Sequence, residues 1–251
     1  MDDPWQSAVG RFLLTKERSK MFERVFYSIY GLFSGKLNSD LAGEQYTQNV
    51  LFWENYKQEQ TKGRKKKDTR YLENQHRFGG MVYGKANRLE QRLFFKGKAL
   101  TAADNCCEVI AVYNVLQSLE EDREDADFPE LLRAFSGKGI AAKGVFGTTP
   151  QAMIAFMKER GYETAVLKAT GITRAACDRV EEEYAAFFYV CFNEKNRPWK
   201  MIHTMAVTKE NHAFVLHNDL EGSRVADHLY DLICGYNKGI NGPIVLVAVR
   251  R

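Results

Sequence analysis

The chain has 251 residues and a formal net charge of +4, with 45% hydrophobic and 27% charged residues. This composition predicts a globular protein with a substantial core, in one large domain or in a domain with an extension. No apolar run approaches the roughly 20 residues that cross a bilayer, and Met1-Asp2-Asp3-Pro4 has no basic stretch leading into an apolar one, so we expect neither a membrane span nor an ordinary signal peptide.

The cysteines indicate a reducing environment. There are five, and two of them, Cys106 and Cys107, are adjacent. They form neither an even disulfide framework nor the Cys-x-x-Cys pairs of a structural zinc site. We therefore expect free thiols and a cytoplasmic location, with no metal and no cofactor.

The first third of the chain is basic and has a helical pattern. Residues 1–100 carry 19 basic against 11 acidic side chains, whereas residues 101–251 carry 17 against 21. Apolar residues from Trp5 to Phe33 recur at spacings of three and four, which predicts an amphipathic helix, and further helices are expected over about 41–56 and 86–95. We predict a mostly helical extension over residues 1–100. Its first helix either packs on the main domain or lies on an anionic membrane surface.

A basic run, Lys62-Gly63-Arg64-Lys65-Lys66-Lys67-Asp68-Thr69-Arg70, interrupts this extension. It is too charged to pack, so it predicts a solvated loop. Such a loop can touch phosphates, but no aromatic residues are interleaved with its lysines. We therefore do not expect nucleic acid as a partner.

From residue 101 the pattern alternates between helices and strands. Residues 107–119 predict a helix with a buried apolar face, a shorter helix follows over 128–135, and Thr149 can cap a third helix that Gly161 ends. Strands are predicted over 162–167, 186–192, 201–208, 213–217 and 243–249. We predict an α+β domain over residues 101–251, whose later strands form a small antiparallel sheet.

The helix start at Cys107 carries the most chemistry. The first N–H groups of a helix lack internal partners and carry the positive end of the macrodipole, which favours a thiolate over a thiol. Nucleophilic cysteines are made in this way. Cys107 is the candidate nucleophile, and Cys106 replaces it if the helix begins one residue earlier. Glu108 is expected to stabilise the first turn, and the remaining cysteines, Cys177, Cys191 and Cys234, are expected to be inert.

The order of these elements resembles the papain-like cysteine peptidases. Cys107-Glu108-Val109-Ile110-Ala111 opens a helix, His203-Thr204-Met205-Ala206-Val207 opens a later strand, and Gly147-Thr148-Thr149-Pro150 opens a second helix. Within that family the chain is similar to the bacterial peptidases that remove leader peptides from bacteriocins, and to their stand-alone relatives. The resemblance covers roughly residues 101–249. It implies a papain-like fold in which a central helix with the cysteine packs on the sheet that carries the histidine.

The resemblance also implies a base and a residue that orients it. In the family the histidine is the general base, and an Asp or Asn at the end of the next strand fixes its ring. Here the hairpin ends in Asn218-Asp219, and Asp219 lies 16 residues after His203. Neighbouring side chains on a strand point to opposite faces, so only one of the two can face His203. The spacing favours Asp219, and His217 is the reserve candidate for the histidine.

The family's oxyanion-hole glutamine has no counterpart just before the cysteine, because residues 98–105 contain no glutamine. Asn105 is the candidate substitute through its side-chain amide, together with the backbone N–H of Cys107.

These residues predict a cysteine peptidase, or a related acyl-transfer enzyme, that acts on peptide or protein substrates. The Cys107 thiol would form a thioester that water then cleaves. Transglutaminase-like and deamidating chemistry needs the same groups, so the sequence leaves these open. The alternative is a catalytically silent papain-like domain that binds a peptide, with the N-terminal helices contacting a membrane or a protein.

Overall fold

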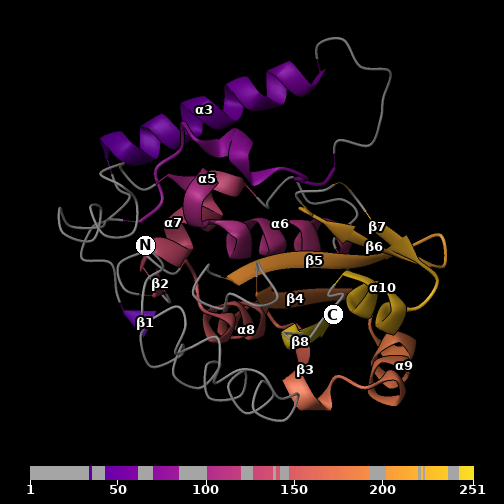
Figure 1. Ribbon diagram of the computed structural model, residues 1–251. Coiled ribbons are helices and arrows are strands. Elements are labelled where there is room, and N and C mark those ends of the chain that lie inside the picture. The colour runs from indigo at the N-terminus through magenta and orange to yellow at the C-terminus, as the bar shows by residue number, and fades with distance from the viewer. Residues whose placement is uncertain are drawn as a thin grey trace, which may run out of the picture.

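The computed structural model describes residues 34–35, 43–61, 70–84, 101–119, 127–137, 140–141, 147–192, 202–219, 222, 224–236 and 243–251. Within them the chain has seven α-helices and a six-stranded antiparallel sheet of order β3-β8-β4-β5-β6-β7 (Figure 1). The expected α+β class is therefore confirmed. The helices predicted before residue 34 and over 86–95, most of the basic run, and the boundary at residue 100 lie outside the described residues.

The centre of the sheet is apolar on both faces. Every residue of β4 is buried, as its unbroken apolar run predicts for a fully covered strand. The sheet consists of β3 (Glu163–Lys168), β4 (Ala186–Phe192), β5 (Ile202–Glu210), β6 (Ala213–His217), β7 (Arg224–Ala226) and β8 (Pro243–Arg250). Asn211 and His212 turn β5 into β6 with φ of 47° and 70°, the left-handed conformation of a tight hairpin. Separately, β1 (Ser34–Gly35) pairs with β2 (Ile140–Ala141).

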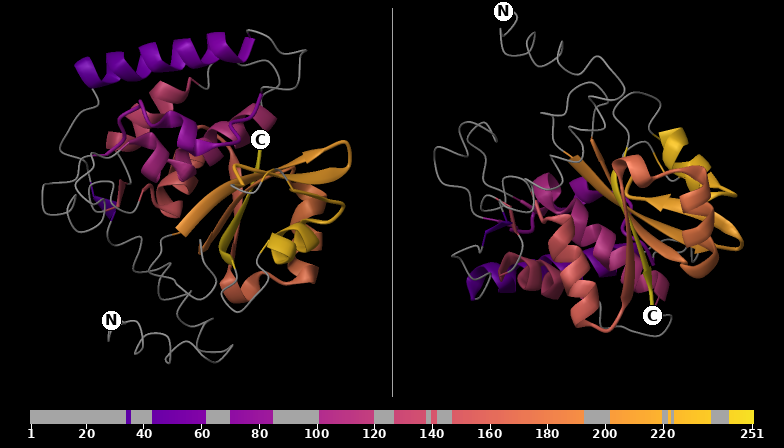
Figure 2. Two further views of the ribbon diagram at one scale, coloured as in Figure 1. Left: turned by 45° about the horizontal axis from the view of Figure 1, so that its top comes forward. Right: turned by 90° about the horizontal axis from the view of Figure 1, so that it is seen from below.

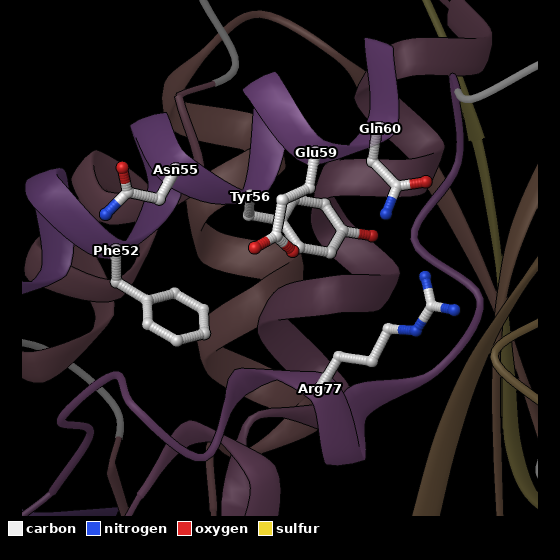
Figure 3. Close-up of a pocket in the computed structure, with 6 residues that line it drawn as sticks. All are labelled: Phe52, Asn55, Tyr56, Glu59, Gln60 and Arg77. Atoms are coloured by element: carbon white, nitrogen blue, oxygen red, sulfur yellow. The ribbon is translucent and has the colours of Figure 1, made fainter. Parts of the chain in front are cut away.

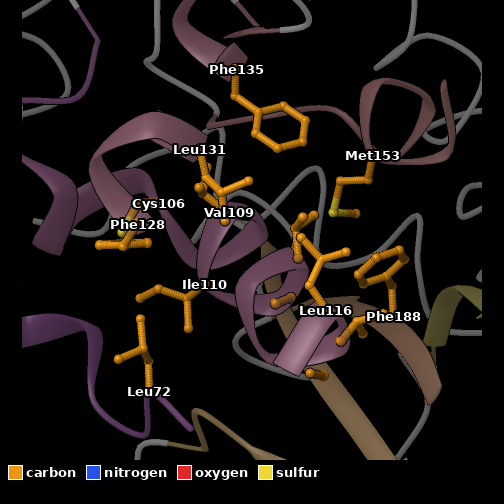
Figure 4. Close-up of a cluster of buried hydrophobic side chains, with 14 of the residues drawn as sticks. Leu72, Cys106, Val109, Ile110, Leu116, Phe128, Leu131, Phe135, Met153 and Phe188 are labelled. Carbon is orange, nitrogen blue, oxygen red and sulfur yellow. The ribbon is translucent and has the colours of Figure 1, made fainter. Parts of the chain in front are cut away.

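Helix α6 (Cys107–Leu119) packs across β4 and β5 on one face of the sheet. Its apolar face meets the other helices of this side: α3 (Glu44–Thr61), α5 (Ala102–Asn105), α7 (Phe128–Gly137) and α8 (Pro150–Glu159) (Figures 1 and 2). Ile110 and Leu116 are buried in a core with Phe128, Met153 and Phe188 (Figure 4). Burying each such side chain contributes roughly 1.5–3 kcal/mol, which holds the start of α6 against the sheet.

The opposite face carries α9 (Arg174–Glu183) and α10 (Leu229–Tyr236), with the short helix η3 (Ala169–Gly171) before α9 (Figure 2). A second core lies beneath these helices, and strand alternation divides β5 between the two cores. Ile202 and Ala206 enter the core of α6, whereas Met205 and Val207 enter the core of α9 and α10. The alternation therefore gives the direction of every side chain along β5.

Residues 70–83 run in irregular conformation over the α6 side, with one short helix, η1 (Gln75–Phe78). Asn114 of α6 accepts a hydrogen bond from Leu72 N (2.8 Å) and donates one to Leu72 O (3.0 Å), and Asn49 of α3 holds Val82 in the same way. These buried amides replace the partners that a neighbouring strand would supply. This segment and Trp53 of α3 share the core of α6, so part of the N-terminal third is packed against the candidate site.

Most predicted elements after residue 101 are confirmed. Helix α6 has the predicted bounds, and Thr149 caps α8 by accepting from Ala152 N at 3.2 Å. Helices α9 and α10 and strand β7 were not predicted. Within the described part of the chain, no helix has both the length and the apolarity to cross a membrane.

Candidate active site

Cys107 lies at the first position of α6, and its thiol is almost fully buried, with 6% of the residue exposed. The thiol donates to Glu108 Oε2 over 3.2 Å. Burial raises the pKa of Cys107 well above its ordinary value and the charge of Glu108 raises it further, while the backbone N–H of Thr204 lowers it. The expected thiolate at the helix start is therefore wrong for this conformation, because burial outweighs the helix terminus.

Glu108 is the second buried ionisable group at this point. Burial raises its pKa from 4.5 to about 7, although the Cys107 thiol and the backbone of Thr148 favour its charged form. Gly147 closes the cluster. Its φ is +66°, and a Cβ there would lie 2.7 Å from Glu108 Oε2. Glu108 thus does more than stabilise a helix turn, since it accepts a hydrogen bond from the thiol of the candidate nucleophile.

Cys106 ends α5 and lies in the apolar core beside α6, fully buried. Burial raises the pKa of its thiol well above the ordinary value, and the charges of Glu108 and Asp104 add to this. Figure 4 shows its side chain among the buried residues of this core. Its surroundings are those of an inert thiol.

The ring of His203, near the start of β5, is bound to the main chain. Its Nε2 lies 2.8 Å from the carbonyl oxygen of Asn218. Because a carbonyl oxygen only accepts, Nε2 carries the proton and Nδ1 keeps its lone pair. Burial lowers the pKa of His203, which the Asn218 carbonyl and the charge of Asp219 partly offset. The ring is therefore a neutral imidazole with one nitrogen available as a base.

The two candidates for orienting the ring act differently from the expectation. Asn218 supplies its main-chain carbonyl, while its side-chain amide forms a reciprocal pair with Gln75: Oδ1 accepts from Gln75 N at 3.1 Å, and Nδ2 donates to Oε1 at 3.4 Å. The Asp219 carboxylate accepts from Arg224 Nε at 2.6 Å. The spacing had favoured the Asp219 side chain as the orienting group, but the ring contact comes from a backbone atom of Asn218.

Cys107 and His203 meet the same short stretch of β5. The backbone N–H of Thr204 faces the sulfur, and Thr204 directly follows His203. His203 pairs with Cys191, whose side chain is in the core of α9 and α10, so alternation directs the imidazole to the face opposite α6. The pairing of β5 with β6 begins only at Ala206. In this conformation the sulfur therefore lies on the α6 side of β5 and the imidazole on the side of α9 and α10, so the strand separates the two groups.

The remaining predicted residues have defined partners. Asn105 donates from Nδ2 to Tyr83 O at 2.9 Å, so one N–H of the expected oxyanion donor is engaged with the main chain. The reserve histidine, His217, lies between Glu73 at Nδ1 (2.6 Å) and Thr208 at Nε2 (2.8 Å).

Residues 71–84 were not predicted to belong to the site, yet Glu73 and Gln75 contact Asn218 directly. The signal that could have found them is the polar run Glu73-Asn74-Gln75-His76 between apolar Leu72 and Phe78, since polar side chains there need buried partners.

A cavity of about 600 Å³ lies between α3 and η1, close to this segment. Phe52, Asn55, Tyr56, Glu59 and Gln60 line it from α3, and Arg77 lines it from η1 (Figure 3). Figure 3 shows the Arg77 guanidinium extending toward Gln60, beside the Tyr56 ring. Arg77 is two residues from Gln75, so the cavity adjoins the segment that contacts Asn218.

Comparisons with known proteins returned no matching family model, no matching curated protein and no matching solved structure.

Proposed function

We propose that this chain is a cysteine peptidase, or a related acyl-transfer enzyme, in which Cys107 is the nucleophile and His203 is the base. The observation that carries the proposal is the hydrogen bond from His203 Nε2 to Asn218 O. The residue after His203, Thr204, has the backbone N–H that faces the Cys107 sulfur. The hydrogen bond to Asn218 leaves the ring neutral with Nδ1 as a base. A thiol at a helix start and a base of fixed tautomer are the two parts that thiol-dependent acyl transfer needs.

In the proposed reaction His203 Nδ1 takes the proton of the Cys107 thiol, and the sulfur attacks the carbonyl carbon of a peptide bond. The tetrahedral intermediate collapses to a thioester as the C–N bond breaks, and the imidazolium returns its proton to the leaving amine. Water then cleaves the thioester and restores the thiol. A second amine in place of water gives transfer, and a glutamine side chain as substrate gives deamidation.

The conformation described here is the resting state of this proposal. The thiol donates to Glu108 and is almost fully buried, so Cys107 must turn away from that carboxyl before it reacts. For sulfur and imidazole to meet, their side chains must move around the edge of β5 before Ala206, where β5 is not paired with β6. The cavity between α3 and η1 is the place we assign to a side chain of the peptide substrate.

Thiol reactivity tests the proposal without a known substrate. Iodoacetamide is applied between pH 5 and 9, and peptide mapping locates the label. The exposed Cys234 is the internal standard. Once the thiol has turned away from Glu108 toward His203, burial no longer raises its pKa, so we expect Cys107 to react faster than Cys234 near pH 6.5, with the label lost in Cys107→Ala and kept in Cys106→Ala. Cleavage of a mixed fluorogenic peptide library is expected to show the same dependence on the two variants.

The burial of the thiol and its raised pKa favour a second candidate, the catalytically silent domain that binds a peptide or a partner. It predicts that Cys234 reacts first and that the buried cysteines all react slowly, with no library cleavage. That result would reject the peptidase proposal. In either case the predicted membrane or protein contact of the N-terminal helix stays a prediction, because that helix lies outside the described residues.

A further inference from the structure

The segment Tyr71–Gln75 forms a clamp on the end of β6. The Tyr71 ring stacks on the His217 ring, with centroids 4.1 Å apart and planes at 28°. The Glu73 carboxylate bridges two successive residues: Oε1 lies 2.6 Å from His217 Nδ1, and Oε2 accepts from Asn218 N over 3.0 Å. Glu73 therefore holds a side chain and a main-chain N–H with its two oxygens.

The clamp acts on a residue whose backbone needs support. Asn218 has φ of +64°, in the left-handed region that residues with a side chain adopt only at a cost in conformational energy. This conformation turns the Asn218 carbonyl toward His203, where it accepts from Nε2. The left-handed conformation of Asn218 thus sets the direction of its carbonyl, and that carbonyl in turn sets the tautomer of the His203 ring.

The bridge sets the proton positions. A carboxylate only accepts, so Nδ1 of His217 carries a proton. Its Nε2 lies 2.8 Å from the Thr208 hydroxyl, which itself donates to Glu210 Oε1 over 3.0 Å. The second carboxylate facing this ring is Glu210, whose Oε1 lies 3.5 Å from His217 Nε2. Glu210 faces the same histidine but has its contact on the opposite nitrogen.

We propose that Glu73 is a positioning residue of the site: it holds Asn218 in the left-handed conformation whose carbonyl selects the Nε2-protonated tautomer of His203. The inference rests on the proposed function, in which Nδ1 of His203 is the base. Glu73→Gln tests it at nearly constant size, because the amide replaces one of the two acceptor oxygens with an NH2 group, which cannot accept a hydrogen bond. Glu210→Gln is the matched control, since it removes a carboxylate from the same histidine.

The readout is the tautomer of His203, from the ¹⁵N shifts of its two ring nitrogens in long-range ¹H–¹⁵N spectra. We expect the Nε2-protonated form in the unmodified chain and in Glu210→Gln, and a mixture of tautomers in Glu73→Gln. Thermal unfolding of each variant checks that the chain is folded. If Glu73→Gln keeps a single Nε2-protonated ring like the control, the proposal is overturned.

A second variant separates Glu73 from the side-chain pair with Gln75. Asn218→Gly removes the amide pair but retains the backbone N–H, and glycine adopts positive φ without strain. We expect it to keep the Nε2-protonated tautomer. Loss of the tautomer in Asn218→Gly but not in Glu73→Gln assigns the positioning to Gln75 and overturns the role of Glu73.

The rate of Cys107 alkylation by iodoacetamide near pH 7 links this geometry to the chemistry. We expect Glu73→Gln to lower it roughly 10-fold, the lower end for losing a supporting partner of a functional group, and Glu210→Gln to leave it unchanged. If the tautomer responds as expected but the unmodified chain shows no activated Cys107, the positioning stands and the peptidase proposal fails. If Cys107 is activated equally in both variants, the proposed function stands and the positioning role fails.

Discussion

The two polar clusters that flank β5 are built in different ways. On the α6 side, Cys107 and Glu108 share one hydrogen bond, and burial raises the pKa of both groups. At the strand edge, His203 is bound to a carbonyl that Glu73 and Gln75 hold through Asn218. In the first cluster, burial favours the protonated thiol and carboxyl. In the second, the Asn218 carbonyl determines which ring nitrogen of His203 carries the proton.

In terms of the proposal, this difference means that the candidate nucleophile and the candidate base are prepared separately. The imidazole of His203 already has its tautomer, since a neighbouring carbonyl selects it. The thiol of Cys107 is masked by a carboxyl that accepts its hydrogen bond. Glu108 and His203 are therefore competing candidates for the base, and mutation of each decides between them.

The largest effect is expected when the base is removed. His203→Gln should reduce peptide-library cleavage by roughly 10²–10⁴-fold, the usual contribution of a general base. The matched control is His228→Gln, a largely exposed histidine bound to Glu181 beside α10. Cleavage rates of the two variants are compared at pH 7. Equal activity in both variants would exclude His203 as the base and leave Glu108.

Glu108→Gln is expected to make the Cys107 thiol more reactive, whereas His203→Gln is expected to lower activity. Without the Glu108 charge the pKa of Cys107 falls, although burial still raises it, so alkylation at pH 8 should become several-fold faster. A slower reaction would instead show that Glu108 takes the proton during attack. The measurement is the alkylation rate of Cys107 relative to Cys234.

The same variant changes how stability depends on pH. Glu108 has a pKa of about 7 in the folded chain against an ordinary 4.5, so the folded state binds more protons between these values. This corresponds to about 3 kcal/mol of stability that is fully present below pH 4.5 and lost as pH rises through 7. We expect urea unfolding of Glu108→Gln to show a flatter pH dependence over that range. An unchanged slope would mean that Glu108 is solvated in the folded chain.

Two glycines measure how tightly the carboxyl is enclosed. Gly161→Ala meets open space at a φ of +85°, so it should cost about 1–2 kcal/mol from backbone strain alone. Gly147→Ala carries a similar strain at +66° and also pushes on Glu108 Oε2 at 2.7 Å. We expect it to cost a further ~1–3 kcal/mol, as overpacking does. Equal unfolding free energies for the two variants would show that the Glu108 carboxyl moves freely.

Helices and strands could be predicted from the sequence where the local pattern of residues was clear. Helix α6 follows from the spacing of its apolar residues, β4 follows from an unbroken apolar run, and β5 follows from its β-branched residues Ile202, Thr204, Val207 and Thr208. The class of the fold followed from these elements. Helix α9 was missed because its many charged residues obscure the pattern of its buried side. Strand β7 was missed because three residues are too few to form a pattern.

The site was predictable only at the level of residue types. Cys107 and His203 could be recognised as candidates because the proposed chemistry depends on their side chains. The group that orients His203 is a main-chain carbonyl, which every residue has. Glu73 could not be assigned because it lies 145 residues from Asn218 in sequence. The raised pKa of Glu108 depends on burial, which includes the close approach of Gly147.

The smallest expected effect comes from the outer edge of the His203 cluster. Arg224 Nε binds the Asp219 carboxylate at 2.6 Å, and the charge of Asp219 raises the pKa of His203 against the lowering by burial. In Arg224→Gln this carboxylate loses its cation, so its charge acts more strongly on the ring. We expect the pKa of His203 to rise by less than about 1, because burial is the larger cause.

An NMR titration of the His203 ring measures this change, and Arg174→Gln is its control, since Arg174 pairs with Asp231 near the surface. Only a neutral imidazole can act as the base, so a raised pKa moves the acid limb of the cleavage profile to higher pH by the same amount. A limb that does not follow the His203 titration would mean that another group limits the reaction. Glu108, with a pKa of about 7, is then the group that sets the limb.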